Sequence, residues 1–288
     1  MTRRVCILGN SHVAAFVAAI DACPDRWPGV SPSFFAAHGH ALDRYDLRDG
    51  WLVSEDKGAR ARIARLTGRD SLRLSDYDAF VVTGLHFSIF TPVRVFRELS
   101  ALDMPSVAGH ETALAEGRPL ASGPMLRAYT ADRLARTMAF RLAHKLRAGG
   151  DVPVFIASQP RPSRRACATG RRYHGFAQLS ERGDGPFVSD WFDRTASALC
   201  AAEGLTFLPQ PAQTVEDGIF TREPFLRGSV RLAKRRNLAH GAEDVLHANA
   251  AFASLLIDDL AEALDSPVCE SAGGKSTCKF DQKPNTIG

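Results

Sequence analysis

The sequence predicts an α/β fold in which helices cover both faces of a mostly parallel sheet. Short apolar runs suited to buried strands alternate with longer amphipathic stretches suited to helices, which is typical of this class. The chain has 288 residues, of which 45% are hydrophobic and 24% charged. This is ordinary globular composition, and it excludes a disordered chain, a fibrous repeat and a disulfide-dense miniprotein.

The first half of the chain contains three predicted strands. The run RVCIL at 4–8 predicts the first, and the turn that follows it leads into a helix over 12–22. SFFAA at 33–37 predicts the second strand, which ends before His38. DAFVVT at 78–83 is the clearest strand and ends at Gly84. The glycine after each of these strands indicates a turn.

The second half continues the alternation. A helix is expected over 130–147, because Leu134, Met138, Leu142 and Leu146 recur at i, i+4 spacing. The remaining elements are strands at 152–157 and 205–208 and helices at 190–202 and 248–264. Four zones rich in Pro, Gly and charge, namely 40–75, 105–128, 160–188 and 209–240, are expected to hold long loops or short helices.

Length and pattern predict one domain over 1–265 and a polar, loosely ordered tail over 266–288. The apolar run near the N-terminus is shorter than the roughly 7–15 residues of a secretory signal, so we expect a cytoplasmic protein. No apolar run approaches the ~18 residues of a membrane span. The net charge of +4 is mild for a nucleic-acid binder, so no such partner is expected. The oligomeric state is left open.

The six cysteines form no CxxC pair and no zinc-type spacing with histidine. Cys269 and Cys278 lie in the tail and could pair under oxidising conditions. No metal site and no cofactor are expected. A metal cluster of His38, His40 and His86 is the weaker alternative, because no carboxylate pattern supports it.

Polar residues follow the first three strands, at the edge where parallel sheets bind ligands. Ser11 lies on the turn after the first strand, where its hydroxyl is exposed and its N–H begins a helix. Gly39 follows the second strand and His86 the third, and each could help to bind an oxyanion. The alternatives are a helix cap for Ser11 and plain turns for the other two.

Asp244 and His247 open the last helix with DxxH spacing. The carboxylate can accept a hydrogen bond from the imidazole, which could then act as the general base for Ser11. The alternative is that Asp244 caps the helix.

Together these segments resemble the SGNH hydrolases, also called GDSL-like hydrolases, over about 4–264. GNSH at 9–12 stands for the serine block, Gly39 for the oxyanion glycine, Gly84–Phe87 for the GxND block and Asp244–His247 for DxxH. The resemblance implies a flavodoxin-like three-layer α/β/α sandwich. It implies a Ser11, His247, Asp244 triad and an oxyanion hole formed by Ser11, Gly39 and His86.

Two residues depart from the family pattern. Asn10 replaces the aspartate that usually precedes the serine, and His86 replaces the asparagine of the oxyanion hole. Asn10 and His12, which flank Ser11, are expected to contact substrate.

Arg161, Arg164 and Arg165 follow the fourth strand in a basic run that also holds Arg171 and Arg172, and they could bind an anionic substrate. A second run holds Arg231, Lys234, Arg235 and Arg236. Solvated loop charge is the alternative for both runs.

The resemblance predicts a serine esterase that removes a short acyl group, most simply acetyl, from a carbohydrate or small metabolite. One alternative is an O-acyltransferase that modifies a glycan, for which acyl-CoA could be the donor. The other is a binding protein without catalysis, which the histidine at position 86 keeps open.

Overall fold

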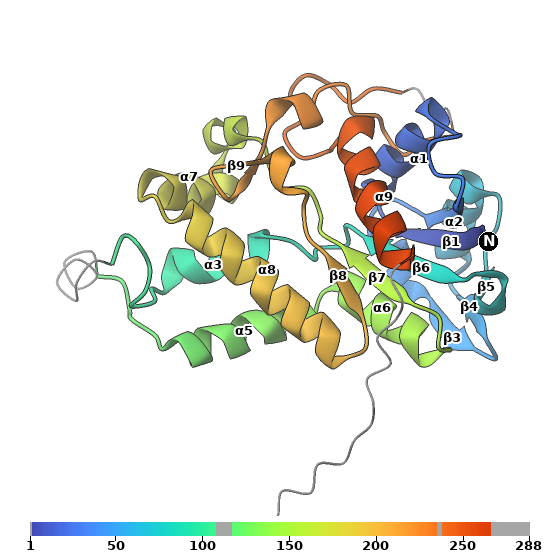
Figure 1. Ribbon diagram of the computed structural model, residues 1–288, viewed down its shortest axis with the longest axis horizontal. Helices are drawn as coiled ribbons and strands as arrows, with labels where there is room; N and C mark the ends of the chain where they lie inside the picture. Colours follow the sequence, from blue (N-terminus) through green and yellow to red (C-terminus); the bar gives the residue numbers. More distant parts are fainter. Residues whose placement is uncertain (1, 108–116, 235–237, 266–288) are drawn as a thin grey trace, which may run out of the picture.

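The centre of the molecule is a five-stranded sheet whose neighbouring strands all run parallel (Figure 1). The computed structural model describes residues 2–107, 117–234 and 238–265. Across the sheet the strands are β2 (Val30–Ala36), β1 (Arg3–Gly9), β6 (Ala79–Thr83), β7 (Val154–Ala157) and β8 (Thr206–Leu208). Numbered by their order in the chain, the strands follow the order 2-1-3-4-5, which is the flavodoxin-like order. The predicted fold class is confirmed.

Alternate side chains of each strand enter two separate cores. In β1, Cys6 and Leu8 pack on one side of the sheet, whereas Val5 and Ile7 pack on the other. Helices α1 (Val13–Ala22) and α9 (Ala250–Asp265) cover the second side. The first side is covered by α2 (Lys57–Thr67), α6 (Met138–Ala148) and α8 (Gly185–Ala202). The result is the three-layer α/β/α arrangement seen in Figure 1.

Further helices extend past the carboxyl ends of the strands, at the left of Figure 1. They are α3 (Phe90–Glu98), α5 (Gly123–Ala135) and α7 (His174–Glu181), together with the first turns of α8. A short hairpin of β9 (Val215–Glu216) and β10 (Phe220–Thr221) lies near them. These elements surround the sheet edge at which ligands bind in open α/β folds.

The zone 40–75 is more ordered than the loops or short helices expected for it. It holds α2 and an antiparallel sheet of β3 (Asp46–Arg48), β4 (Trp51–Val53) and β5 (Leu72–Arg73). Strands of two or three residues are too short to show the alternation from which a strand is recognised.

The single helix expected over 130–147 is wrong, because α5 ends at Ala135 and α6 begins at Met138. Thr137 interrupts the helix by capping α6. Its Oγ1 accepts a hydrogen bond from the Phe140 N–H at 3.4 Å and donates one to the Leu134 carbonyl at 2.7 Å. Threonine is a good N-cap, since its hydroxyl satisfies an N–H that has no partner within the helix. The i, i+4 apolar pattern continues across the break, which hides it in the sequence.

The remaining predicted strands and helices are present with ends shifted by a few residues. Cys6 and Cys200 are buried and unpaired. The tail with Cys269 and Cys278, and also Arg235 and Arg236, lie outside the described residues. None of the helices in the described ranges is long and apolar enough to cross a membrane.

Candidate active site

Ser11 lies on a tight turn between β1 and α1. Gly9 permits this turn, because a Cβ there would lie 2.4 Å from the Thr83 carbonyl oxygen on β6. The Asn10 side chain closes the turn by accepting a hydrogen bond from the His12 N–H at 3.3 Å. Among the described residues, no acceptor binds the Ser11 N–H. That N–H is therefore available to an oxyanion at the start of a helix.

The loop after β6 has an unusual backbone. Gly84, Leu85 and His86 all have left-handed φ angles, of 72°, 51° and 72°. A Cβ at Gly84 would lie 2.3 Å from the Asn10 Oδ1, so only glycine fits beside the serine turn. The Ala139 N–H donates to the Leu85 carbonyl at 3.2 Å and holds the loop in place. Left-handed backbone costs about 1–2 kcal/mol at a non-glycine residue, and such strain is concentrated at functional sites.

Ser11, His247 and Asp244 form one hydrogen-bonded chain of side chains. His247 Nε2 lies 2.9 Å from Ser11 Oγ, and His247 Nδ1 lies 2.7 Å from Asp244 Oδ2. An ionised carboxylate can only accept, so Nδ1 carries the proton and donates to Asp244. Nε2 then accepts from the serine hydroxyl, which is the geometry that a general base requires.

The remaining carboxylate oxygen of Asp244 is also fixed. Its Oδ1 accepts hydrogen bonds from the backbone N–H groups of Leu246 at 2.9 Å and His247 at 2.8 Å. Burial alone would raise the pKa of Asp244. The hydrogen bonds from the His247 side chain and from these two N–H groups outweigh it and hold the pKa well below its usual range. Asp244 is thus an anion over the whole physiological pH range.

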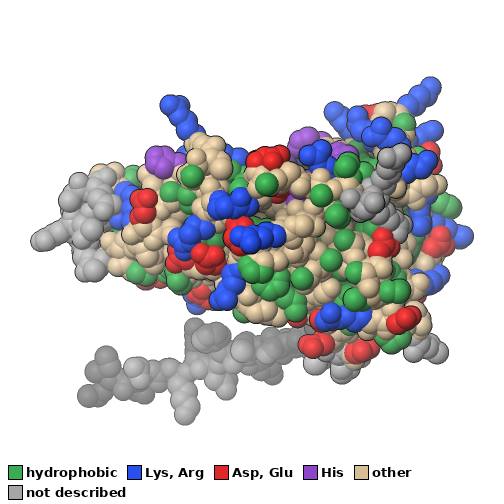
Figure 2. All heavy atoms as spheres, turned by 90° about the horizontal axis from the view of Figure 1, so that it is seen from above, with side chains coloured by type: hydrophobic (Ala, Val, Ile, Leu, Met, Phe, Trp, Pro, Cys, Tyr) green, Lys and Arg blue, Asp and Glu red, His purple; other side chains and the backbone are tan. Residues whose placement is uncertain are grey.

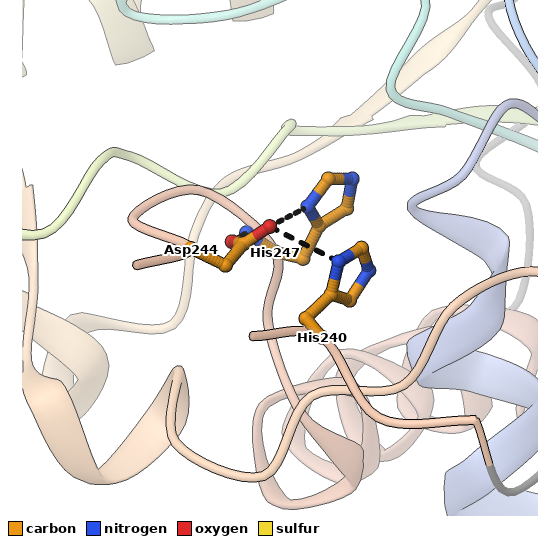
Figure 3. Close-up of side chains that lie close together, drawn as sticks. All are labelled: His240, Asp244 and His247. Atoms are coloured by element: carbon orange, nitrogen blue, oxygen red, sulfur yellow. Dashed lines mark hydrogen bonds and ion pairs between the residues drawn. The ribbon is translucent and has the colours of Figure 1, made fainter. Parts of the chain in front are cut away.

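His240 is a second histidine on Asp244, and sequence reasoning missed it (Figure 3). Its Nδ1 lies 3.1 Å from the same Oδ2 that binds His247. The two imidazole rings stack with centroids 4.0 Å apart and planes 12° from parallel. Burial lowers the pKa of His240, and the neighbouring His247 lowers it further. A histidine four residues before the DxxH aspartate was the only signal in the sequence.

His12 packs against His247 from within the core. The residue is 6% exposed, and its ring stacks on that of His247 at 5.0 Å between centroids. Burial lowers the pKa of His12 to about 3, and the neighbouring His247 acts in the same direction. Asn10 and His12 were expected to contact substrate. In the structure the Asn10 side chain closes the turn before Ser11, and His12 is a buried, neutral ring packed against His247.

The predicted oxyanion residues lie on loops that flank Ser11, because β2 and β6 are the two neighbours of β1. The turn after β2 is tied to β1 by a hydrogen bond from the Ala37 N–H to the Gly9 carbonyl at 3.3 Å. Gly39 has a φ of +68°, and its N–H binds no acceptor within the described part of the chain. The exposed His86 ring stacks on His40 at 5.7 Å between centroids. Burial of part of the ring lowers the pKa of His86, and His40, Arg172 and Arg94 lower it further.

The structure does not bring Arg161 and Arg164 to the triad. Arg161 is 1% exposed, and its guanidinium binds the Gly218 carbonyl and, at 3.4 Å, the Asp193 carboxylate. Arg164 pairs with Glu216 at 2.7 Å. Sequence cannot show these pairings, which join segments distant in the chain. On the face seen in Figure 2, blue basic side chains likewise lie beside red acidic ones at several places.

Arg165 lies closer to the triad than the other two arginines of the run. Its guanidinium pairs with Glu223 at 3.0 Å and donates to the backbone carbonyls of Ala242 at 3.1 Å and Asp244 at 3.4 Å. Arg165 therefore supports the loop that carries Asp244.

A group that could hold a metal ion exists within the described ranges, but it is not the predicted alternative of His38, His40 and His86. It consists of His240, Asp244 and His247, which offer ligand atoms within 4.8 Å of one another. The same atoms form the hydrogen bonds of the triad, so a bound ion would displace the contact between His247 and Asp244. The arrangement therefore serves either acid–base chemistry at Ser11 or metal binding, and not both at once.

The comparisons with known proteins give one match. The structure is similar to that of an extracellular lipase from Streptomyces rimosus, with 12% sequence identity and a TM-score of 0.40. The match covers 90% of this chain and 100% of the lipase chain. No protein-family model and no curated protein matches the sequence. The fold assignment rests on the strand order of this chain, which is the order that the resemblance to SGNH hydrolases implies.

Proposed function

We propose that the protein is a serine esterase of the SGNH type, which hydrolyses a short-chain ester, most simply an acetyl ester, of a carbohydrate or small metabolite. The observation that carries this proposal is the hydrogen-bonded chain from Ser11 Oγ through His247 to Asp244, with distances of 2.9 and 2.7 Å. If Ser11 served only to cap its helix, its hydroxyl would not need a hydrogen bond to a histidine from the far end of the chain.

In the first half of the reaction, Ser11 Oγ attacks the ester carbonyl carbon while His247 Nε2 takes the hydroxyl proton. The carbonyl oxygen becomes an oxyanion. The bond from the carbonyl carbon to the alcohol oxygen then breaks, and His247 returns its proton to the departing alcohol. The acyl group remains on Ser11.

In the second half, water attacks the acyl carbon and gives a proton to His247. Ser11 Oγ leaves, takes the proton back from His247, and the carboxylic acid is released. Asp244 remains ionised throughout and stabilises the imidazolium form of His247. The stacked rings of His12 and His240 keep the imidazole in the plane that both hydrogen bonds require.

The oxyanion would be held by the unpaired N–H groups of Ser11 and Gly39, with the His86 ring as a third donor. The low pKa of His86 keeps the ring neutral at pH 7, and a neutral imidazole still has one N–H to donate. One such donor contributes about 10²- to 10³-fold to turnover in related chemistry.

A fluorophosphonate probe tests the proposal directly, because only an activated serine displaces its fluoride. We expect one covalent adduct, located on Ser11 by mass spectrometry of the digested protein. Ser11→Ala should give no adduct, and His247→Ala should react at least 100-fold more slowly. Labelling that is absent from the wild type, or equal in all three proteins, would contradict the proposal and favour a binding protein without catalysis.

A further inference from the structure

A cavity of about 670 Å³ lies beside the candidate active site. His40 and His86, which follow β2 and β6, form part of its wall. Strands β2 and β6 are the two neighbours of β1, which leads into Ser11. The cavity therefore begins beside the predicted oxyanion residues. Residues of α3, α5 and α6 form most of the rest of the wall, together with Asp43, Gln159 and Arg172 from other segments. A volume of this size is within the range of about 300–1,000 Å³ found for small-molecule sites.

The cavity is strongly basic. Its wall contains more arginines than carboxylates, namely Arg94, Arg133, Arg136, Arg141 and Arg172 against Asp43 and Glu98. Both carboxylates are already neutralised, since Asp43 pairs with Arg141, and Glu98 pairs with Arg97 at 2.6 Å. Arg136 is also engaged, by Asp132 on α5. A cation in this cavity would therefore meet repulsion, and an anion would be attracted.

Arg94 and Arg172 have no carboxylate partner among the residues that the structure describes. The Arg172 guanidinium lies over the Phe90 ring, 5.3 Å from its centroid, which leaves its N–H groups free to donate. Arg94, Arg172 and His86 line the same cavity, so both arginines lie on the oxyanion side of the site. Two guanidinium groups in one wall suit a phosphate, whose oxygens accept paired N–H donors.

We propose that this cavity binds phosphate groups of the substrate through Arg94 and Arg172. The inference deepens the proposed function and rests on it, since the bound phosphate would place the acyl carbon at Ser11. Phe90, Val95 and Met138 supply apolar wall for the organic part of the ligand. Of the five basic residues after β7, which the sequence offered as a possible anion site, Arg172 alone lies in the wall of this cavity.

A phosphate-bearing acyl compound can come from two sources. It can be an acyl ester of a phosphorylated sugar, whose alcohol oxygen leaves with the proton from His247. It can also be an acyl thioester of a phosphate-bearing carrier such as coenzyme A, whose sulfur leaves in the same way. In both compounds the phosphate is separated from the scissile bond. This separation is needed if the phosphate is to occupy the cavity while the acyl carbon lies at Ser11.

Isothermal titration calorimetry on the full-length Ser11→Ala variant tests phosphate binding without turnover of the ligand. The probes are inorganic pyrophosphate, glucose 6-phosphate and coenzyme A. We expect saturable pyrophosphate binding, which Arg94→Gln and Arg172→Gln each weaken about tenfold, the loss expected for one charge-assisted contact. Arg65→Gln, a change of an exposed arginine in α2, is the matched control and should bind as the parent does. Tighter binding of glucose 6-phosphate would identify a sugar ester, and tighter binding of coenzyme A an acyl carrier.

The proposal is overturned if pyrophosphate does not bind at millimolar concentration, or if Arg65→Gln weakens binding as much as the two cavity variants do. Binding does not depend on the Ser11 hydroxyl, so this result is separable from the proposed esterase activity. Phosphate binding without any ester hydrolysis would contradict the proposed esterase activity and support the phosphate site. Ser11-dependent hydrolysis without phosphate binding would contradict the phosphate site and support the esterase activity.

Discussion

Asp244→Asn should abolish most activity by forcing His247 into the wrong tautomer. Asp244 Oδ1 accepts two backbone N–H groups, at 2.9 and 2.8 Å. These donors require the amide oxygen of asparagine at that position. The amide NH₂ must then occupy the place of Oδ2 and face His247 Nδ1, where the distance is 2.7 Å. Nδ1 would have to accept, and Nε2 would carry the proton and could no longer take one from Ser11.

The corresponding change in a serine protease lowers kcat about 10⁴-fold, and we expect a loss on the order of 10³- to 10⁴-fold here. The assay is the initial rate of p-nitrophenyl acetate hydrolysis at pH 7.5, with circular dichroism to show that the variant is folded. Glu243→Gln removes a charge from the adjacent, exposed position and serves as the control. A loss below tenfold for Asp244→Asn, or an equal loss for Glu243→Gln, would refute the tautomer argument.

Three further predictions concern the other groups at the site. His86→Ala should lower kcat/KM for p-nitrophenyl acetate about 10²- to 10³-fold, whereas His86→Asn, which also donates and tolerates left-handed backbone, should retain most of the wild-type value. Equal kcat/KM values for the two variants would exclude a donor role. His12 has a folded pKa of about 3 and an unfolded pKa near 6.5, so the unfolded chain binds the extra proton as pH falls through this window. The free energy of unfolding in urea should therefore fall by up to about 1.4 kcal/mol per pH unit between pH 6 and 4, and His12→Gln should reduce this slope; an unchanged slope would contradict the assignment. Activity should survive dialysis against EDTA, because the imidazole N–H groups of His240 and His247 already occupy the Asp244 carboxylate that a metal ion would need. Loss of activity that Zn²⁺ restores would instead show that His240, Asp244 and His247 hold a metal.

The sheet and the ends of its strands could be predicted because they depend on local pattern. Buried parallel strands are continuous apolar runs, and turn-forming or polar residues follow them within one or two positions. Ser11 and His247 are 236 positions apart, yet the α/β alternation brings their segments to one sheet edge, where the two side chains meet. Their catalytic roles stay predictions that the experiments above test.

The rest depends on contacts that no local pattern records. Arg161 looked like a surface cation, but Asp193 and the Gly218 carbonyl hold it in the core. His240 reaches Asp244 only because the loop before α9 folds back on itself. Thr137 breaks a helix whose apolar spacing continues unchanged. For Arg161 the partners are distant in sequence, for Thr137 a single hydroxyl decides, and for His240 the conformation of the loop brings a near neighbour into contact.

Hydrolysis of p-nitrophenyl acetate by the wild type, beside Ser11→Ala and His247→Ala, tests the central claim most directly. The account predicts turnover by the wild type and a loss of at least 10³-fold in both variants, because each side chain acts only through the other. Equal background rates in all three folded proteins would contradict a catalytic role for the hydrogen-bonded chain of Ser11, His247 and Asp244.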